Sequence, residues 1–250
     1  MSKYFSNHEK LSLEDKNKGR IFKYGTIYPI MLMLIPIILV MLQKHLSCII
    51  ILGLIGIFMI IGAGVNLKFL YYFLFTGCSL VTALALFTDY TKERITVWRN
   101  PEEYKLTGGW QTLQGLMAIG SGGFFGVGFG NSVMKHCYVS EPANDMIFAI
   151  LCEELGLLGA FFAILLFASL IFRGYKIAIN ADDVYSRLVA FGISTKLAIQ
   201  VLLNIAVVTN TIPNTGISLP FFSYGGSSLL IIFFEMGIIL SISRFSKIQK

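Results

Sequence analysis

The sequence predicts an all-α, polytopic membrane protein: a bundle of about six transmembrane helices with one large extracellular loop. Hydrophobic residues make up 55% of the 250-residue chain, charged residues make up only 14%, and the mean hydropathy is +0.72. A soluble domain of this size carries about 25% charged residues. The apolar residues also gather in runs that approach the length of about 20 residues that a helix needs to cross a bilayer.

Six apolar runs are predicted to span the membrane. They cover residues 26–42, 47–65, 68–88, 145–172, 184–210 and 227–245. Residues 1–25 are polar and rich in lysine, and they lack the pattern of a cleavable signal peptide. We therefore expect a cytoplasmic N-terminal tail over 1–25, a first span that acts as its own insertion signal, and a single transmembrane domain over 26–250.

The distribution of Lys and Arg predicts that both termini are cytoplasmic. In that orientation the inner segments hold thirteen Lys and Arg residues and the outer segments hold six, as the positive-inside rule requires. The loop 89–143 then lies outside. The same rule accounts for the net charge of +6, which gives no indication of nucleic-acid binding.

The outer loop 89–143 is too long for a plain connector. Trp110, Leu113, Leu116 and Met117 recur at helical spacing, which predicts an amphipathic helix in the membrane interface. A glycine-rich stretch, 120–130, follows. It is either a flexible linker or, as its interleaved Phe and Val residues favour, a backbone that packs closely at the membrane surface. A phosphate-binding loop is excluded because no strand precedes it.

A second irregular segment, 211–227, reads TIPNTGISLPFFSYGGS and lies between the last two predicted spans. Its prolines and glycines argue against regular helix. Non-helical backbone at membrane depth survives only where protein buries it or where it lines a cavity. The segment is therefore either an ordinary outer turn or a re-entrant loop that walls a polar cavity.

Asp145 stands at the outer start of the fourth predicted span. Asn144 is a suitable helix cap, and an acid in the first turn interacts favourably with the helix dipole, so a purely structural role is one interpretation. The alternative is a functional carboxylate at the membrane–water boundary. It would face the cationic loop that contains Arg99, Lys105 and Lys135.

A set of polar residues is predicted near the middle of the membrane. Its members are Glu153, Glu154, Lys196, Gln200, Asn204 and Glu235. Charges at this depth are costly, and they normally pair or line a polar cavity. The set therefore indicates either a structural Lys–Glu clamp between spans, with Lys196 bound to one of the three glutamates, or a pathway for protons or substrate.

Three linked blocks of the sequence resemble one family. The blocks are GWQTLQGLMAIGSGGFFGVGFGNSVMK, SEPANDMIFAILCEELGLLG and QVLLNIAVVTNTIPNTGISLPFFSYGGSS. Their order and spacing are similar to those of the SEDS family (FtsW, RodA and SpoVE). The stretch LQKHLSCIIILGLIGIFMIIGAG resembles the hairpin of that family, although Lys44 stands where the family usually has Pro. The resemblance covers about 26–245 and corresponds to about the last six of the ten spans of the family.

The resemblance implies a peptidoglycan glycosyltransferase in the cytoplasmic (inner) membrane. Such an enzyme polymerises lipid II into glycan strands at the outer face, in cell division, elongation or sporulation. The implied partners are a class B penicillin-binding protein, which is a transpeptidase, and proteins of the divisome or elongasome. Asp145 falls on the acidic residue that is regarded as essential in the family. A divalent cation is a candidate cofactor, although the sequence shows no metal-ligand motif.

The residues suit the implied reaction. Asp145 would be the base near the acceptor hydroxyl, and the cations Lys135 and Arg99 would stabilise the leaving pyrophosphate. An α-linked donor that gives a β-linked product indicates inversion, which needs no covalent sugar–enzyme intermediate. The predicted binding set is completed by Gln111, Gln114, Ser223, Gly225 and Gly226.

Two alternatives come from other functional classes. Mid-membrane charges and an irregular loop are also features of transporters, so the chain is alternatively a lipid II flippase. A carboxylate at the outer edge argues against that alternative, because a flippase needs no base there. The other alternative is a non-catalytic scaffold for a transpeptidase, because the first four spans of the family have no counterpart in this chain.

Overall fold

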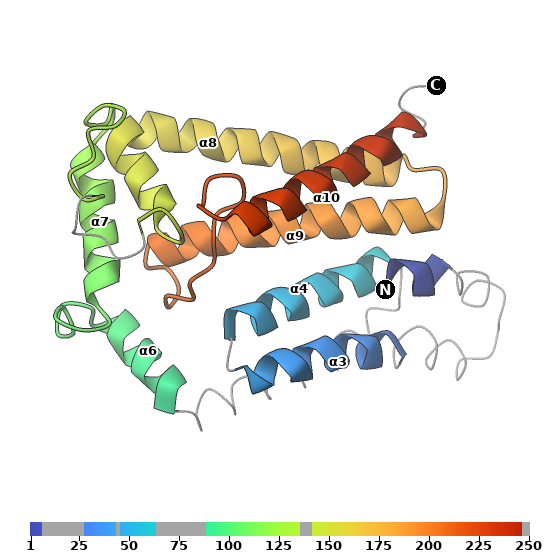
Figure 1. Ribbon diagram of the computed structural model, residues 1–250, viewed down its shortest axis with the longest axis horizontal. Coiled ribbons are helices and arrows are strands. Elements are labelled where there is room, and N and C mark those ends of the chain that lie inside the picture. The colour runs from blue at the N-terminus through green and yellow to red at the C-terminus, as the bar shows by residue number, and fades with distance from the viewer. Residues whose placement is uncertain (7–27, 44–45, 64–88, 136–141, 247–250) are drawn as a thin grey trace. The chain divides into compact units, whose positions relative to one another are not determined.

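The computed structural model describes residues 1–6, 28–43, 46–63, 89–135 and 142–246 (Figure 1). Within them the chain is helical and contains no strand, which confirms the predicted all-α class. The third predicted span, 68–88, and most of the predicted tail lie outside the described residues. The longer helices are α3 (Tyr28–Leu42), α4 (Leu46–Gly62), α6 (Asp89–Arg99), α7 (Trp110–Gly122), α8 (Ile147–Ile179), α9 (Val184–Val208) and α10 (Gly226–Arg244).

Three of these helices are long and apolar enough to cross a membrane. They are α8 with 33 residues, α9 with 25 and α10 with 19. Helices α3 and α4 contain shorter apolar stretches, 30–40 and 48–62. Each of the five helices coincides with most of one predicted span, because a long apolar run satisfies its backbone only as a helix once it is in lipid. Helix α8 continues beyond the predicted end at 172, to Ile179. The chain is therefore a multi-pass membrane protein.

The chain divides into two compact units. The first contains residues 1–80, 170–199 and 233–250, and the second contains 81–169 and 200–232. The core of the first unit is built on Met33 of α3, Met59 and Ile60 of α4, and Leu188 of α9, all of which are buried. Helices α3 and α4 pack directly on each other.

Helix α9 begins at Val184 because Asp183 caps it. The Asp183 Oδ2 atom accepts a hydrogen bond of 2.8 Å from the backbone N–H of Ser186, which satisfies one of the donors that a helix start leaves without a partner. This bond lowers the pKa of Asp183, because it favours the ionised carboxylate. The cap is therefore charged at neutral pH, where it also complements the helix dipole.

In the second unit, α8 is broken at Gly156, where φ is 67° and ψ is −168°. Figure 1 shows the two parts of α8 meeting at an angle. Only glycine adopts this backbone conformation readily. The predicted span over 145–172 corresponds to this helix, and the break at Gly156 was not predicted from the sequence. Glu153 and Glu154 precede the break and therefore belong to the first part of α8.

The break removes two backbone hydrogen bonds, and the glycine-rich stretch replaces them. In an unbroken helix the carbonyl oxygens of Glu153 and Glu154 would accept hydrogen bonds from residues 157 and 158. They instead accept from the N–H groups of Val127 and Gly128, at 3.0 Å each. Both carbonyl groups therefore keep a partner.

The N–H groups on the other side of the break are satisfied in the same way. Leu157 N donates to the Gly123 carbonyl oxygen at 2.9 Å, and Leu158 N donates to the Phe124 carbonyl oxygen at 3.3 Å. A Cβ atom on Gly126 would lie 2.2 Å from the Glu154 carbonyl oxygen. The glycines thus permit a close approach of two backbones, and the stretch 120–130 is a packed element rather than a flexible linker.

Replacing Gly156 should destabilise this junction. A Cβ atom there would lie 2.4 Å from Gly126 N and 2.6 Å from the Phe124 carbonyl oxygen, and φ is in the range that L-residues avoid. We expect Gly156→Ala to cost about 1–3 kcal/mol from backbone strain alone, measured as a lower thermal unfolding temperature in detergent. Gly120→Ala is the matched control, because its Cβ would meet no atom within 4 Å. Equal unfolding temperatures for the two variants would contradict this account of the break.

The described part of the loop 89–143 contains two helices rather than one. Helix α7 confirms the predicted helix at Trp110–Gly122, and α6 at its start was not predicted. The buried face of α7 carries Thr112, Gln114 and Ala118, whereas Met117 is 53% exposed. The polar side of α7 therefore faces the protein, where Thr112 and Gln114 are buried.

Candidate active site

Asp145 lies in the turn 142–146 that leads into α8, one residue before Met146 and two before the first helical residue, Ile147. Its carboxylate is partly buried and accepts hydrogen bonds from Gln111 Nε2, which is 3.2 Å from each of the two carboxylate oxygens. Gln111 is in the first turn of α7. Two residues that were predicted separately, one as a base and the other as a binding residue, are therefore in direct contact.

Asn204 of α9 holds the backbone at Asp145 from the other side. Its side chain is fully buried, and its Nδ2 atom donates to the carbonyl oxygens of Asp145 at 2.8 Å and Ile217 at 2.6 Å. A buried donor that has both of its hydrogens paired in this way fixes two chain segments at once. Asn204 was predicted as part of a mid-membrane cluster, and in the structure it contacts the turn 142–146 that contains Asp145.

The predicted irregular segment 211–227 lies beside this turn; it is non-helical up to Gly225, and α10 begins at Gly226. Ser223 Oγ donates to the Asn144 carbonyl oxygen at 2.6 Å, and Tyr224 N donates to the Ala143 carbonyl oxygen at 2.7 Å. A Cβ atom on Gly216 would lie 3.8 Å from Asp145 Oδ2. The predicted irregularity is confirmed, and the hydroxyl of Ser223, predicted to bind substrate, connects the segment to the Asp145 turn.

Helix α6 supports the irregular segment. The Arg94 guanidinium donates to the carbonyl oxygen of Asn214, and Trp98 Nε1 donates to the carbonyl oxygen of Asn210 at 2.9 Å. Each bond satisfies a carbonyl that a non-helical backbone leaves without an internal partner. Arg99, the predicted pyrophosphate ligand, is exposed at the end of the same helix.

Glu153 and Glu154 bind the loop that precedes the Asp145 turn. Glu153, which is 2% exposed, accepts hydrogen bonds from the Ser132 hydroxyl and from the N–H groups of Val133 and Met134, at 3.0 and 3.3 Å. A carboxylate that accepts several such bonds is well compensated for its burial. Glu153 therefore fixes the fold of this loop.

Lys135 forms an ion pair with Glu154, with 2.7 Å between Nζ and Oε1. Its ammonium group also donates to the Gly130 carbonyl oxygen at 2.5 Å. The predicted cation is thus held at a defined position by the glycine-rich stretch and the first part of α8, and its side chain is 26% exposed.

Lys196 pairs with Glu235, and the distance between Nζ and Oε1 is 2.5 Å. This contact confirms the predicted Lys–Glu clamp and selects one of its three candidate glutamates. Both residues belong to the first compact unit, whereas Glu153, Glu154 and Asn204 belong to the second. The residues of the predicted polar set therefore do not form one cluster but take part in separate contacts.

The other predicted residues also lie in the second unit. Gln114 is buried on α7, and Gln200 is half-buried on α9. Gly225 precedes α10, and Gly226 is its first residue. Among the described residues, no group of three or more His, Cys, Asp or Glu side chains could hold a metal ion.

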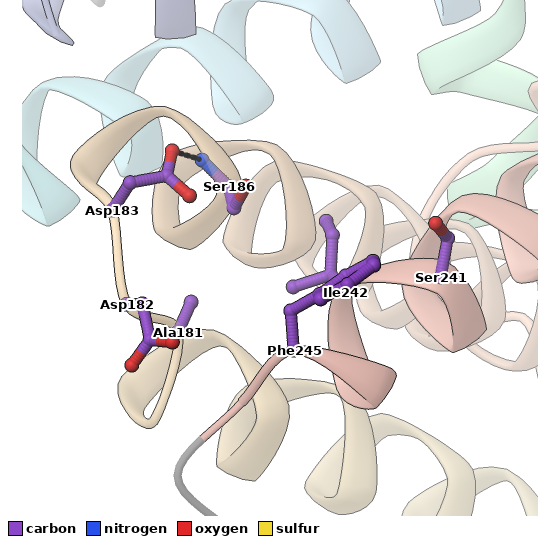
Figure 2. A pocket seen from close by; sticks show the side chains of 7 residues that line it. All are labelled: Ala181, Asp182, Asp183, Ser186, Ser241, Ile242 and Phe245. Carbon is purple, nitrogen blue, oxygen red and sulfur yellow. Dashed lines mark hydrogen bonds between the residues drawn. The ribbon is translucent and has the colours of Figure 1, made fainter.

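A pocket of about 190 Å³ lies in the first unit, between the α8–α9 turn and the end of α10 (Figure 2). Asp182, Asp183, Ser186 and Phe245 are among the residues that line it. Figure 2 shows Asp183 bonded to Ser186, so this acid serves as the helix cap. None of the predicted site residues lines this pocket.

Sequence reasoning missed two residues close to the candidate site, Arg94 and Asn214. Arg94 lies on α6, and the polar composition of residues 89–99 gave no indication of a helix there. Asn214 carried a signal, because Asn two residues before Gly is typical of a turn in which the side chain accepts a backbone hydrogen bond. Gly216 N does donate to Asn214 Oδ1, at 3.0 Å.

Comparison with known proteins gives a consistent result. The family model for FtsW, RodA and SpoVE, described as cell cycle protein, matches residues 2–248. Stage V sporulation protein E of Bacillus subtilis is 47% identical over 191 residues, which cover 76% of this chain and 52% of the relative. The probable peptidoglycan glycosyltransferase FtsW of Geobacter sulfurreducens is 37% identical over 234 residues, 93% of this chain and 62% of the relative. The chain thus spans about half to three-fifths of the length of these relatives.

Solved structures show the same fold. One is a peptidoglycan synthase complex described as coordinating polymerization and crosslinking. It matches with a TM-score of 0.75 and 26% identity, over 95% of this chain and 66% of that chain. The rod shape determining protein RodA of Thermus thermophilus matches with a TM-score of 0.63 and 23% identity, over 98% of this chain and 62% of that chain.

Proposed function

Because the chain belongs to the FtsW, RodA and SpoVE family, we propose that it is a peptidoglycan glycosyltransferase that polymerises lipid II. One observation carries the proposal. A carboxylate, Asp145, stands immediately before an apolar membrane helix, and Gln111 holds both of its oxygens. Relatives named peptidoglycan glycosyltransferase support the same assignment.

In the proposed reaction, Asp145 accepts the proton of the 4-hydroxyl of one disaccharide. The hydroxyl oxygen forms a bond to the anomeric carbon of a second disaccharide, and the bond from that carbon to the lipid pyrophosphate breaks on the opposite face. The configuration is therefore inverted in one displacement. Lys135 and Arg99 would stabilise the negative charge that develops on the leaving pyrophosphate. Lys135 is suited to this role because Glu154 and Gly130 fix its ammonium group before the substrate arrives.

The proposed partner is a class B penicillin-binding transpeptidase, together with divisome or elongasome proteins. The match to a peptidoglycan synthase complex supports an assembly of this kind. Gel analysis of glycan products from the purified chain and lipid II, alone and with the transpeptidase, tests the activity. Absence of product in both cases would refute the polymerase assignment and favour the scaffold alternative.

We also propose that the protein lies in the cytoplasmic membrane with both termini inside and 89–143 outside. The thirteen-to-six distribution of Lys and Arg supports this orientation. Single cysteines at exposed positions test it, in a background from which the native cysteines are removed. From outside intact cells, an impermeant maleimide should label Glu103→Cys and should not label Asp182→Cys. The reverse pattern would contradict the orientation.

A further inference from the structure

We propose that Asn214 is a positioning residue that orients Asp145 through the side chain of Gln111. The inference rests on the proposed function, since it assigns a task to a neighbour of the proposed base. Asn214 belongs to the irregular segment and is far from Asp145 in the sequence. The contacts of Asn214 nevertheless determine which end of the Gln111 amide faces the carboxylate.

The geometry of three side chains carries the proposal. Asn214 Nδ2 donates to Gln111 Oε1 at 2.8 Å. With its oxygen occupied in this way, Gln111 turns its Nε2 atom toward Asp145, where it lies 3.2 Å from both Oδ1 and Oδ2. The result is a chain of hydrogen bonds in one direction: Asn214 donates to Gln111, and Gln111 donates to Asp145.

Asn214 is itself fixed at both ends. Its Oδ1 atom accepts from Gly216 N at 3.0 Å, and its main-chain carbonyl accepts from Arg94. The Oδ1 atom is therefore committed to a backbone donor, and the Nδ2 atom points to Gln111. Gly216 has a φ of 64°, a conformation that favours glycine and keeps the turn tight beside Asp145.

The direction of this chain matters for a base. The two ends of a Gln amide have nearly the same shape but opposite hydrogen-bonding character. With the amide reversed, Oε1 would face the carboxylate, and two acceptors would repel each other. With the observed direction, a donor meets a charged acceptor, which is the stronger type of hydrogen bond. Asn214 thus maintains the orientation that keeps Asp145 in place.

Asn214→Asp is a sharp test because it keeps the size of the side chain and replaces the neutral amide donor with a charged carboxylate. An Asp side chain keeps an oxygen for the N–H of Gly216, so the turn is retained, but it cannot donate to Gln111 Oε1. The Gln111 amide would then have a carboxylate at each end, and its orientation would no longer be fixed. We expect the kcat of polymerisation to fall about 10²-fold, as misplacement of a reacting group does, with little change in the KM for lipid II. Asn180→Asp makes the same chemical change at the end of α8, where Asn180 contacts Lys176, and should keep parental activity.

A double-mutant cycle separates positioning from a general structural role. If Asn214 acts through Gln111, then Asn214→Asp should cause no further loss in a Gln111→Ala background. Independent, multiplicative losses in the two variants would overturn the proposal. Gln111→Ala by itself should resemble Asn214→Asp in its kcat and KM.

The same experiment distinguishes failure of this inference from failure of the proposed function. If Asp145→Asn is inactive while Asn214→Asp is fully active, the positioning role is wrong and the base assignment stands. If Asp145→Asn is fully active, or the parent makes no glycan, the base assignment loses its support. In that case, thermal unfolding tests the contact between Asn214 and Gln111. Melting-temperature shifts of Asn214→Asp and Gln111→Ala should be non-additive, and additive shifts would overturn the proposed coupling.

Discussion

Asp145→Asn is expected to reduce polymerisation of lipid II by about 10²–10⁴-fold, the range typical of a lost general base. The substitution keeps the size of the side chain and removes the charge and the proton acceptor. Gln111 and Asn204 would still hold the turn, because Asn204 binds the carbonyl oxygen of residue 145 rather than its side chain. We therefore expect membrane insertion and transpeptidase binding to stay near parental levels.

The measurement is the initial rate of glycan formation by the purified chain with lipid II and the transpeptidase. Glu102→Gln is the matched control, because Glu102 is an exposed acid of the loop 89–143 and its replacement should leave the rate unchanged. An Asp145→Asn variant that polymerises at the parental rate would refute the assignment of the base. Loss of transpeptidase binding in the same variant would show that its defect is structural.

Lys196→Met is expected to cost about 3–5 kcal/mol of folding stability, because it strands the charge of Glu235 between apolar helices. The side chains of Lys196 and Glu235 are only 26% and 19% exposed, and charges in membrane helices normally need a partner. The expected result is a lower yield of folded protein in detergent and a lower thermal unfolding temperature.

The structure also predicts which second change should rescue the variant. Glu235→Gln should restore part of the stability of Lys196→Met, because it removes the stranded charge. Glu153→Gln should not, because the Glu153 carboxylate is bonded to the loop at 132–134. Lys176→Met, at an exposed position near the end of α8, is the matched control. Parental stability of Lys196→Met with all glutamates intact would refute the clamp.

The sequence alone determined where most of the membrane helices lie. Apolar runs at 145–172, 184–210 and 227–245 correspond to α8, α9 and α10, because hydrophobic length is a local property and a bilayer allows few alternatives to helix. It also identified the irregular segment, since Pro213, Pro220 and Gly216 oppose a regular helix. Several polar residues of the candidate site, among them Asp145, Gln111 and Asn204, were also recognised, but in separate groups.

The tertiary structure alone decided how those residues are connected. Glu153 and Glu154 were assigned to the middle of a straight span, but the break at Gly156 gives them to the loop at 132–135. Helical spacing measures distance along one axis and cannot show that a distant glycine-rich stretch replaces the hydrogen bonds of a broken turn.

The same limit applies to Asp145. Its contact with Gln111 crosses 34 residues, and the contact of Gln111 with Asn214 crosses 103. Periodicity and composition report on neighbours within a few turns, whereas the bond between Gln111 and Asn214 depends on where the chain returns after the two membrane helices α8 and α9. The sequence therefore determined which side chains had the chemistry, and only the packing of the loops decided which of them meet.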